Sequence, residues 1–89
     1  MKAVITVTGT DKIGIIAGVS AILAELSVNI EDISQTTMQG LFMMFMMTEI
    51  SSLTVPFGEL AGRLSQKGAE MGLEIRIQKD EIFRAMHSV

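Results

Sequence analysis

The segment at residues 41–50, LFMMFMMTEI, constrains the fold of this chain more than any other stretch. As a β-strand it distributes apolar side chains over two sides, with Leu41, Met43, Phe45 and Met47 on one side and Phe42, Met44, Met46 and Ile50 on the other. A strand that is apolar on both sides is buried on both sides. The fold therefore has to supply two covers for this one strand.

The other segments follow a simple order of strands and helices. Alternating patterns predict strands at residues 2–8, 30–37 and 73–79, and apolar residues at helical spacing predict helices at residues 15–27 and 56–71. The resulting order, βαββαβ, is typical of the ferredoxin-like α+β sandwich, a four-stranded antiparallel sheet with two helices on one face. In that arrangement the first and third strands are central, and the polar second and fourth strands suit the sheet edges.

Turn and cap residues separate these elements. Residues 38–40 predict a tight hairpin, and Asn29 suits the left-handed backbone that follows a helix. Thr54 is a candidate cap for the second helix, which Gly72 ends. Residues 80–89 carry apolar side chains at helical spacing and predict a short docked helix.

Composition excludes several classes of protein. The 89 residues suffice for one domain, 48% of them are hydrophobic, and none is cysteine. A chain without cysteine forms no disulfide, thiolate zinc site or thiol nucleophile, and the cytoplasm is its expected compartment. The net charge of −3 argues against a nucleic-acid partner. A membrane is not expected either, because the longest apolar stretch, residues 13–24, falls short of the roughly 20 residues that a spanning helix needs.

The second cover of residues 41–50 predicts self-association. Two helices on one sheet face leave the opposite side of this strand uncovered, and soluble monomers avoid large exposed apolar patches. We therefore expect a homodimer or higher oligomer. The polar strand at residues 30–37 could extend the sheet edge to edge, or the apolar faces could stack. Exposure of Met44 and Met46 on a lone subunit would count against this prediction.

Residues 6–34, TVTGTDKIGIIAGVSAILAELSVNIEDIS, resemble the opening of an ACT domain. The shared features are a strand, a turn of the type [DN]-[RK]-x-G, a helix of the type GIIAxVSxILAE, and Asn-Ile at the start of the next strand. The resemblance extends to the ACT segments of the glycine-cleavage transcriptional repressor and formyltetrahydrofolate deformylase, and to small stand-alone prokaryotic ACT proteins. It implies that residues 1–89 form a single ACT domain, with residues 80–89 as a short docked extension.

The resemblance implies a non-catalytic regulatory module that dimerises and binds an amino acid or similar small ligand between two subunits. The implied ligand site is the first strand-to-helix turn with the start of the second strand, at Thr10, Asp11, Lys12, Ile13, Gly14, Asn29 and Ile30. Gly14 would allow close approach to the backbone, and helix-start amides favour a carboxylate. Ile13 stands where the family often has Pro, and Asp11 where amino-acid-binding members often have Asn.

Each of these residues also has a purely structural interpretation. Asp11 could simply cap the first helix, and Asn29 could serve the turn. A lone His87, without cysteine or converging carboxylates, predicts no metal site, and no cofactor is expected.

Two functions other than ligand sensing are alternatives for this chain. A pure interaction or scaffold module would dimerise without any small ligand. An acylphosphatase-like enzyme would need an arginine in the first strand-to-helix loop, where this chain has only Lys12, so we expect no enzyme.

Overall fold

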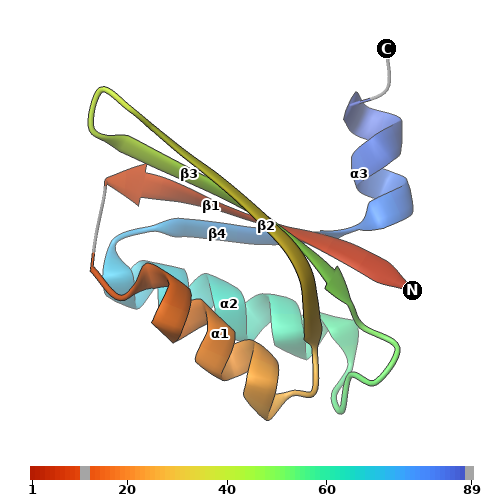
Figure 1. The fold of residues 1–89 in the computed structure, drawn as a ribbon. Helices are drawn as coiled ribbons and strands as arrows, with labels where there is room; N and C mark the ends of the chain where they lie inside the picture. Colours follow the sequence, from red (N-terminus) through yellow and green to blue (C-terminus); the bar gives the residue numbers. More distant parts are fainter. Residues whose placement is uncertain (11–12, 88–89) are drawn as a thin grey trace.

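The computed structural model describes residues 1–10 and 13–87 and confirms the predicted fold class. Its elements, in chain order, are β1 (Lys2–Thr10), α1 (Ile15–Glu25), β2 (Asn29–Met38), β3 (Leu41–Glu49), α2 (Phe57–Met71), β4 (Glu74–Lys79) and α3 (Asp80–His87). The four strands form one antiparallel sheet in the order β2-β3-β1-β4, so β1 and β3 are central and β2 and β4 are edges (Figure 1).

Helices α1 and α2 lie side by side against one face of the sheet, while α3 rises from the other (Figure 1). The core lies between the helices and the sheet, because strand residues that alternate inward meet the apolar stripes of both helices. Its fully buried large side chains are Ile5, Val7, Val19, Leu23, Met44, Met46, Leu60 and Leu64. No helix in the described part of the chain combines the length and apolar character needed to cross a membrane.

The two sides of β3 meet different surroundings. Met44 pairs with Val7 and Met46 with Ile5, and both methionines are fully buried beneath the helices. The alternate residues Met43, Phe45 and Met47 point to the open face, where Phe45 is 38% exposed. Exposure of Met44 and Met46 would have counted against self-association. Both are buried, but α1 and α2 of the same subunit cover them, so their burial gives no evidence for a second subunit.

Three local predictions can be compared with the observed turns. The hairpin at residues 38–40 is confirmed, with positive φ angles of 52° at Gln39 and 81° at Gly40. Gly72 ends α2 with a φ of 71°, as predicted. The left-handed residue after α1 is Ser27, with a φ of 61°, whereas Asn29 already lies in β2.

The predicted cap of α2 is wrong. Pro56 occupies the N-cap position without a side-chain cap hydrogen bond. The Thr54 hydroxyl instead donates to the carbonyl of Leu26 at 3.4 Å, and the Thr54 amide donates to the same carbonyl at 3.2 Å. Thr54 thus ties the loop before α2 to the end of α1.

Candidate functional site

The turn between β1 and α1 presents an open helix start. Gly14 is the N-cap residue of α1, with a φ of 87° and no side-chain cap hydrogen bond. A side chain added at Gly14 would meet no described atom within 4 Å, and Ile13 is fully exposed. Backbone amides in the first turn of a helix have no partner within the helix, so they are available to an anion. Asp11 and Lys12 lie outside the described residues, and the N-cap position suggested for Asp11 belongs to Gly14.

The start of β2 carries the other half of the predicted site. Asn29 is exposed and pairs with Glu49, while Ile30 is half-buried and packs against the core. Thr10 pairs with Leu41, which lies at the opposite end of β3 from Glu49. Eight residues of strand separate these two levels, a span of about 26 Å. One subunit therefore does not bring the Thr10–Gly14 turn and Asn29 together.

Strand β2 leaves one edge of the sheet unpaired within the described chain. It is ten residues long, contains neither proline nor lysine, and is exposed at every position except Ile30. The opposite edge strand, β4, has six residues and carries Arg76 and Lys79. Basic residues are one device that blocks pairing with another chain, so β2 is the longer and less basic of the two edges, although it carries Glu31, Asp32 and a register shift near its start.

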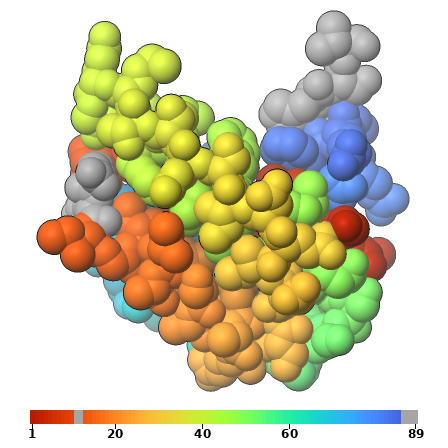
Figure 2. Space-filling view, in the orientation of Figure 1, coloured from red at the N-terminus to blue at the C-terminus, as the bar shows by residue number. Residues whose placement is uncertain are grey.

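Apolar side chains lie next to this edge on the helix side of the sheet. Glu25 accepts a hydrogen bond from Arg63 of α2 at 2.7 Å, which places one flank of α1 against α2. At 100° per residue Ile16 lies on the other flank, and its side chain is 41% exposed. Ile33 of β2, on the same side of the sheet as Met46, is 39% exposed. Figure 2 shows the start of α1 and β2 next to each other on one face of the molecule.

Charged groups near Asn29 are paired with one another. The N-terminal ammonium of Met1 donates to the Glu49 carboxylate at 2.8 Å, and the Ser51 amide donates to it at 3.0 Å. These hydrogen bonds, the ammonium first, lower the pKa of Glu49 to about 2. Lys2 Nζ donates to Glu31 Oε1 at 2.6 Å, and this hydrogen bond raises the pKa of Lys2.

Glu31 and its neighbour Asp32 are not a pair for acid–base chemistry. Strict alternation would place these neighbours on opposite faces of the sheet, but the β2 register shifts between Ile30 and Asp32. Glu31 bonds Lys2, and Asp32 Oδ1 accepts from the amide of Ile33 at 2.9 Å. Both carboxylates therefore serve the local structure of β2.

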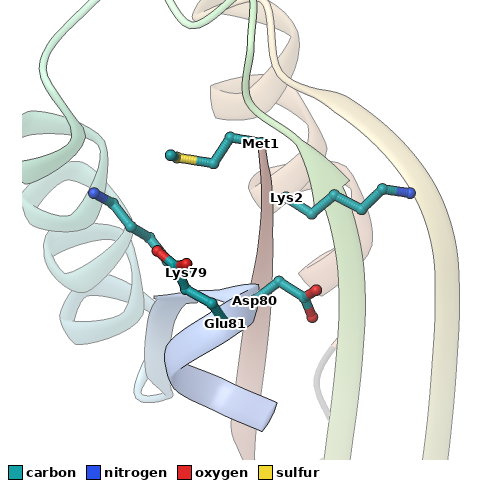
Figure 3. A pocket seen from close by; sticks show the side chains of 5 residues that line it. All are labelled: Met1, Lys2, Lys79, Asp80 and Glu81. Carbon is teal, nitrogen blue, oxygen red and sulfur yellow. The ribbon is translucent and has the colours of Figure 1, made fainter. Parts of the chain in front are cut away.

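A cavity of about 280 Å³ lies elsewhere, where β1 begins and β4 passes into α3. It is lined by Met1, Lys2, Lys79, Asp80 and Glu81 (Figure 3). Lys2 points toward β2 and bonds Glu31, and Lys79 Nζ lies 5.5 Å from the centre of the Phe57 ring. None of its lining residues belongs to the predicted ligand site, so the cavity is a separate feature. Among the described residues no three His, Cys, Asp or Glu side chains gather to hold a metal ion.

The strand order, the two helices on one face and the glycine turn before α1 all match one family. The family model described as "ACT domain" matches residues 2–78. The chain belongs to the ACT domain family. It is thus one of a class of regulatory domains, as the sequence resemblance predicted.

Relatives of this ACT domain extend over its whole length. The UPF0237 protein lin0537 of Listeria innocua is 53% identical over 89 residues, covering 100% of both chains. The solved structure of an ACT domain protein from Streptococcus pneumoniae is 43% identical, with a TM-score of 0.81 over 93% of each chain. This ACT domain thus matches both relatives over nearly all of their length.

Larger proteins contain the same fold. A formyltetrahydrofolate deformylase from Pseudomonas syringae matches 88% of this chain and 27% of its own at 22% identity, with a TM-score of 0.78. A putative glycine cleavage system transcriptional repressor matches 88% and 44% at 23% identity, with a TM-score of 0.72. These likenesses concern the fold alone, and they confirm the resemblance to the ACT segments of both kinds of protein.

Proposed function

We propose that this ACT domain is a non-catalytic regulatory module of the cytoplasm that dimerises along β2 and binds an amino acid between the subunits. One observation carries the proposal: Thr10 and Asn29 lie level with opposite ends of β3, eight residues of strand or about 26 Å apart. A site of that kind needs a second chain to complete it. The unpaired edge of β2 lies between the two halves and is the place where such a chain can join.

A two-fold axis at the middle of β2 brings the halves together. Antiparallel pairing of β2 with its copy places Asn29 of one subunit beside Met38 of the other, at the end of the sheet where Thr10 pairs with Leu41. The same pairing covers Ile16 and Ile33, which are exposed beside the edge. It also joins the two sheets into one sheet of eight strands. The interface is isologous, so each dimer would have two equivalent sites.

The groups at each site suit the two charged ends of an amino acid. The open first turn of α1, next to Gly14, offers backbone amides to a carboxylate. The Asn29 side chain supplies both a donor and an acceptor, so its carbonyl oxygen can accept from the ligand ammonium. The roles of Asp11, Lys12, Ile13 and Ile30 remain predictions from the family resemblance.

Ligand titration tests this function directly. Each of the twenty amino acids is added to the wild type and to Asn29→Ala, and binding is followed by calorimetry and thermal shift. We expect at least one amino acid to stabilise the wild type, and its affinity to fall about tenfold in the variant, equivalent to one hydrogen bond of roughly 1.4 kcal/mol. Gln66→Ala, on the exposed side of α2, is the matched control and should bind as the wild type does.

The edge-to-edge dimer has its own test. Ile33→Lys places a charge beside the β2 edge, and Gln66→Lys places the same charge on the outer side of α2. Sedimentation should show the first variant losing the β2 dimer and the second keeping it. If no amino acid binds while the dimer persists, the ligand proposal fails and the alternative of a ligand-free scaffold module is favoured.

A further inference from the structure

A second cavity lies at the foot of α3, on the open face of the sheet, which is the face opposite α1 and α2. Helix α3 packs against β1 and β4, so it covers only that half of the open face. Where the covered half ends, a cavity of about 260 Å³ lies between α3 and the edge strand β2, and in Figure 2 the molecule is hollowed between the β2–β3 hairpin and α3. The residues that line this cavity are Val4, Asp32, Ser34, Phe45, Met46, Met47 and Phe83.

The floor of the cavity and its α3 side are apolar. Val4 of β1 pairs with Met47 of β3, so the two side chains lie together on the open face, where Val4 is only 5% exposed. Phe45, two residues before Met47 on the same strand, is 38% exposed. Phe83 of α3 is half-buried and forms the wall on the helix side. Two aromatic rings, a thioether and a branched aliphatic group together favour a ligand with an apolar body.

The β2 side of the cavity is polar, because a register shift turns Asp32 toward it. Ile30 pairs with Thr48, whose side chain is fully buried beneath the helices. Strict alternation would turn Asp32 toward the helices as well, but the shift after Ile30 places Asp32 opposite Met47, on the open face. Register shifts caused by one extra residue often re-aim a side chain beside a functional site.

The carboxylate of Asp32 leaves one oxygen uncommitted. Its Oδ1 accepts from the amide of Ile33 at 2.9 Å, whereas its Oδ2 accepts no hydrogen bond from residues 1–10 or 13–87. Within the same residues Asp32 forms no ion pair, since Lys2, at the adjoining end of β1, donates to Glu31 at 2.6 Å instead. Asp32 is also the one charged residue among those that line the cavity. The cavity therefore combines apolar walls with a single negative charge that no lining residue balances.

We propose that this cavity binds a small organic amine, in which a primary ammonium group is carried by an aromatic ring or a branched aliphatic chain. The ammonium donates to Oδ2 of Asp32 and to the hydroxyl of Ser34, both on the exposed side of the cavity, and the apolar body lies between Phe45 and Phe83. The volume of about 260 Å³ is just below the roughly 300 Å³ at which small-molecule sites begin. The ligand is therefore limited to one ring or one short branched chain.

The charge of the cavity selects an amine against the corresponding amino acid. An α-carboxylate beside the ammonium would lie close to Asp32, and no lining residue is a cation that could hold it. The start of α1 has the opposite character, since its open amides favour a carboxylate. Because one subunit forms the whole cavity, the amine site needs neither the dimer nor the amino-acid site of the proposed function.

Calorimetry with phenethylamine and isoamylamine tests the site. Phenethyl alcohol, which lacks the charge, and phenylalanine, which adds a carboxylate, are the comparison compounds. We expect both amines to bind the wild type, and neither comparison compound to displace phenethylamine at equal concentration. Nuclear Overhauser contacts from the bound amine to the methyl group of Met47 and the ring of Phe83 should locate it in the cavity.

Two variants test the two sides of the cavity. Asp32→Asn keeps the size of the side chain and its acceptor for the Ile33 amide but removes the charge, so the affinity for phenethylamine should fall at least tenfold. Phe83→Ala removes the apolar wall and should also weaken binding, with the helix content checked by circular dichroism. Glu70→Gln, at an exposed position of α2, is the matched control and should bind phenethylamine as the wild type does.

The amine site and the proposed amino-acid site can fail separately. Asn29→Ala should lose amino-acid affinity and keep its affinity for phenethylamine, whereas Asp32→Asn should do the reverse. Absence of binding by both amines, an unchanged affinity in Asp32→Asn, or displacement of phenethylamine by an equal concentration of phenylalanine would each overturn the amine site. None of these results would bear on the amino-acid site at Gly14 and Asn29.

Discussion

The two sides of β3 carry the same kinds of side chain but have different surroundings. On the helix side Met44 and Met46 are fully buried by α1, α2 and their neighbours on β1. On the open side Phe45 is 38% exposed and Met47 is half-buried. The comparison shows that one strand can complete the core of its own subunit with alternate residues while the equally apolar residues between them stay partly exposed.

The largest difference between the two sides should appear on truncation of methionine. Met46→Ala removes a fully buried side chain, so we expect the free energy of unfolding to fall by about 2–5 kcal/mol. Met47→Ala, measured in denaturant at the same low protein concentration, should lower it much less, because its side chain is half-buried in one subunit. Equal losses for the two variants would contradict the assignment of these two sides.

A smaller effect is expected from the buried hydroxyl on the helix side. Thr48 is fully buried, and its Oγ1 donates to the carbonyl of Ala3 at 2.8 Å. Thr48→Val keeps the shape and removes this hydrogen bond, which should lower the free energy of unfolding by about 1 kcal/mol. Thr36→Val, at an exposed position of β2, is the control and should stay within about 0.5 kcal/mol of the wild type. A neutral result for Thr48→Val would mean that the bond adds no net stability.

The smallest effect concerns the end of β3 and depends on pH. Glu49 has a pKa of about 2 in the folded chain, below its ordinary value of 4.5, because the N-terminal ammonium and Ser51 donate to it. A lowered pKa stabilises the fold above pH 4.5, and this contribution is lost as the pH falls toward 2. Unfolding at a series of pH values should show a shallower acid dependence for Glu49→Gln than for the wild type. Glu59→Gln, on α2, is the control, and an identical slope for Glu49→Gln and the wild type would argue against the ion pair.

The strands and helices could be predicted from the sequence because each has its own periodicity and turn residues. The polar patterns of β2 and β4 also indicated which strands are edges, and the structure confirms both. The sequence could not tell which side of β3 meets the helices, because both sets of alternate residues are apolar. That choice is made by pairing with β1, whose Ile5 and Val7 face the helices beside Met46 and Met44.

The candidate site was harder to predict. Gly14 and Asn29 could be identified as residue types suited to a turn and to hydrogen bonding, but their separation along β3 follows only from the strand register. The sequence assigned the cap of α2 to Thr54 and the left-handed position after α1 to Asn29, because each residue type suits its role. In the structure other residues occupy these two positions, Pro56 and Ser27. Ser27 adopts the left-handed backbone, and Thr54 bonds Leu26 across two elements. Such long-range contacts leave no periodic mark in a sequence.

The contrast between the long β2 edge and the short β4 edge has a consequence for growth by strand addition. In the proposed dimer, two copies that join through β2 would use up that edge in a single step, because both contribute the same strand to the contact. The enlarged sheet then ends on both sides in β4, a strand of six residues whose arginine and lysine discourage further pairing. In the proposed dimer, polymerisation into fibres would therefore stop at that point, and strand addition through β2 would be self-limiting.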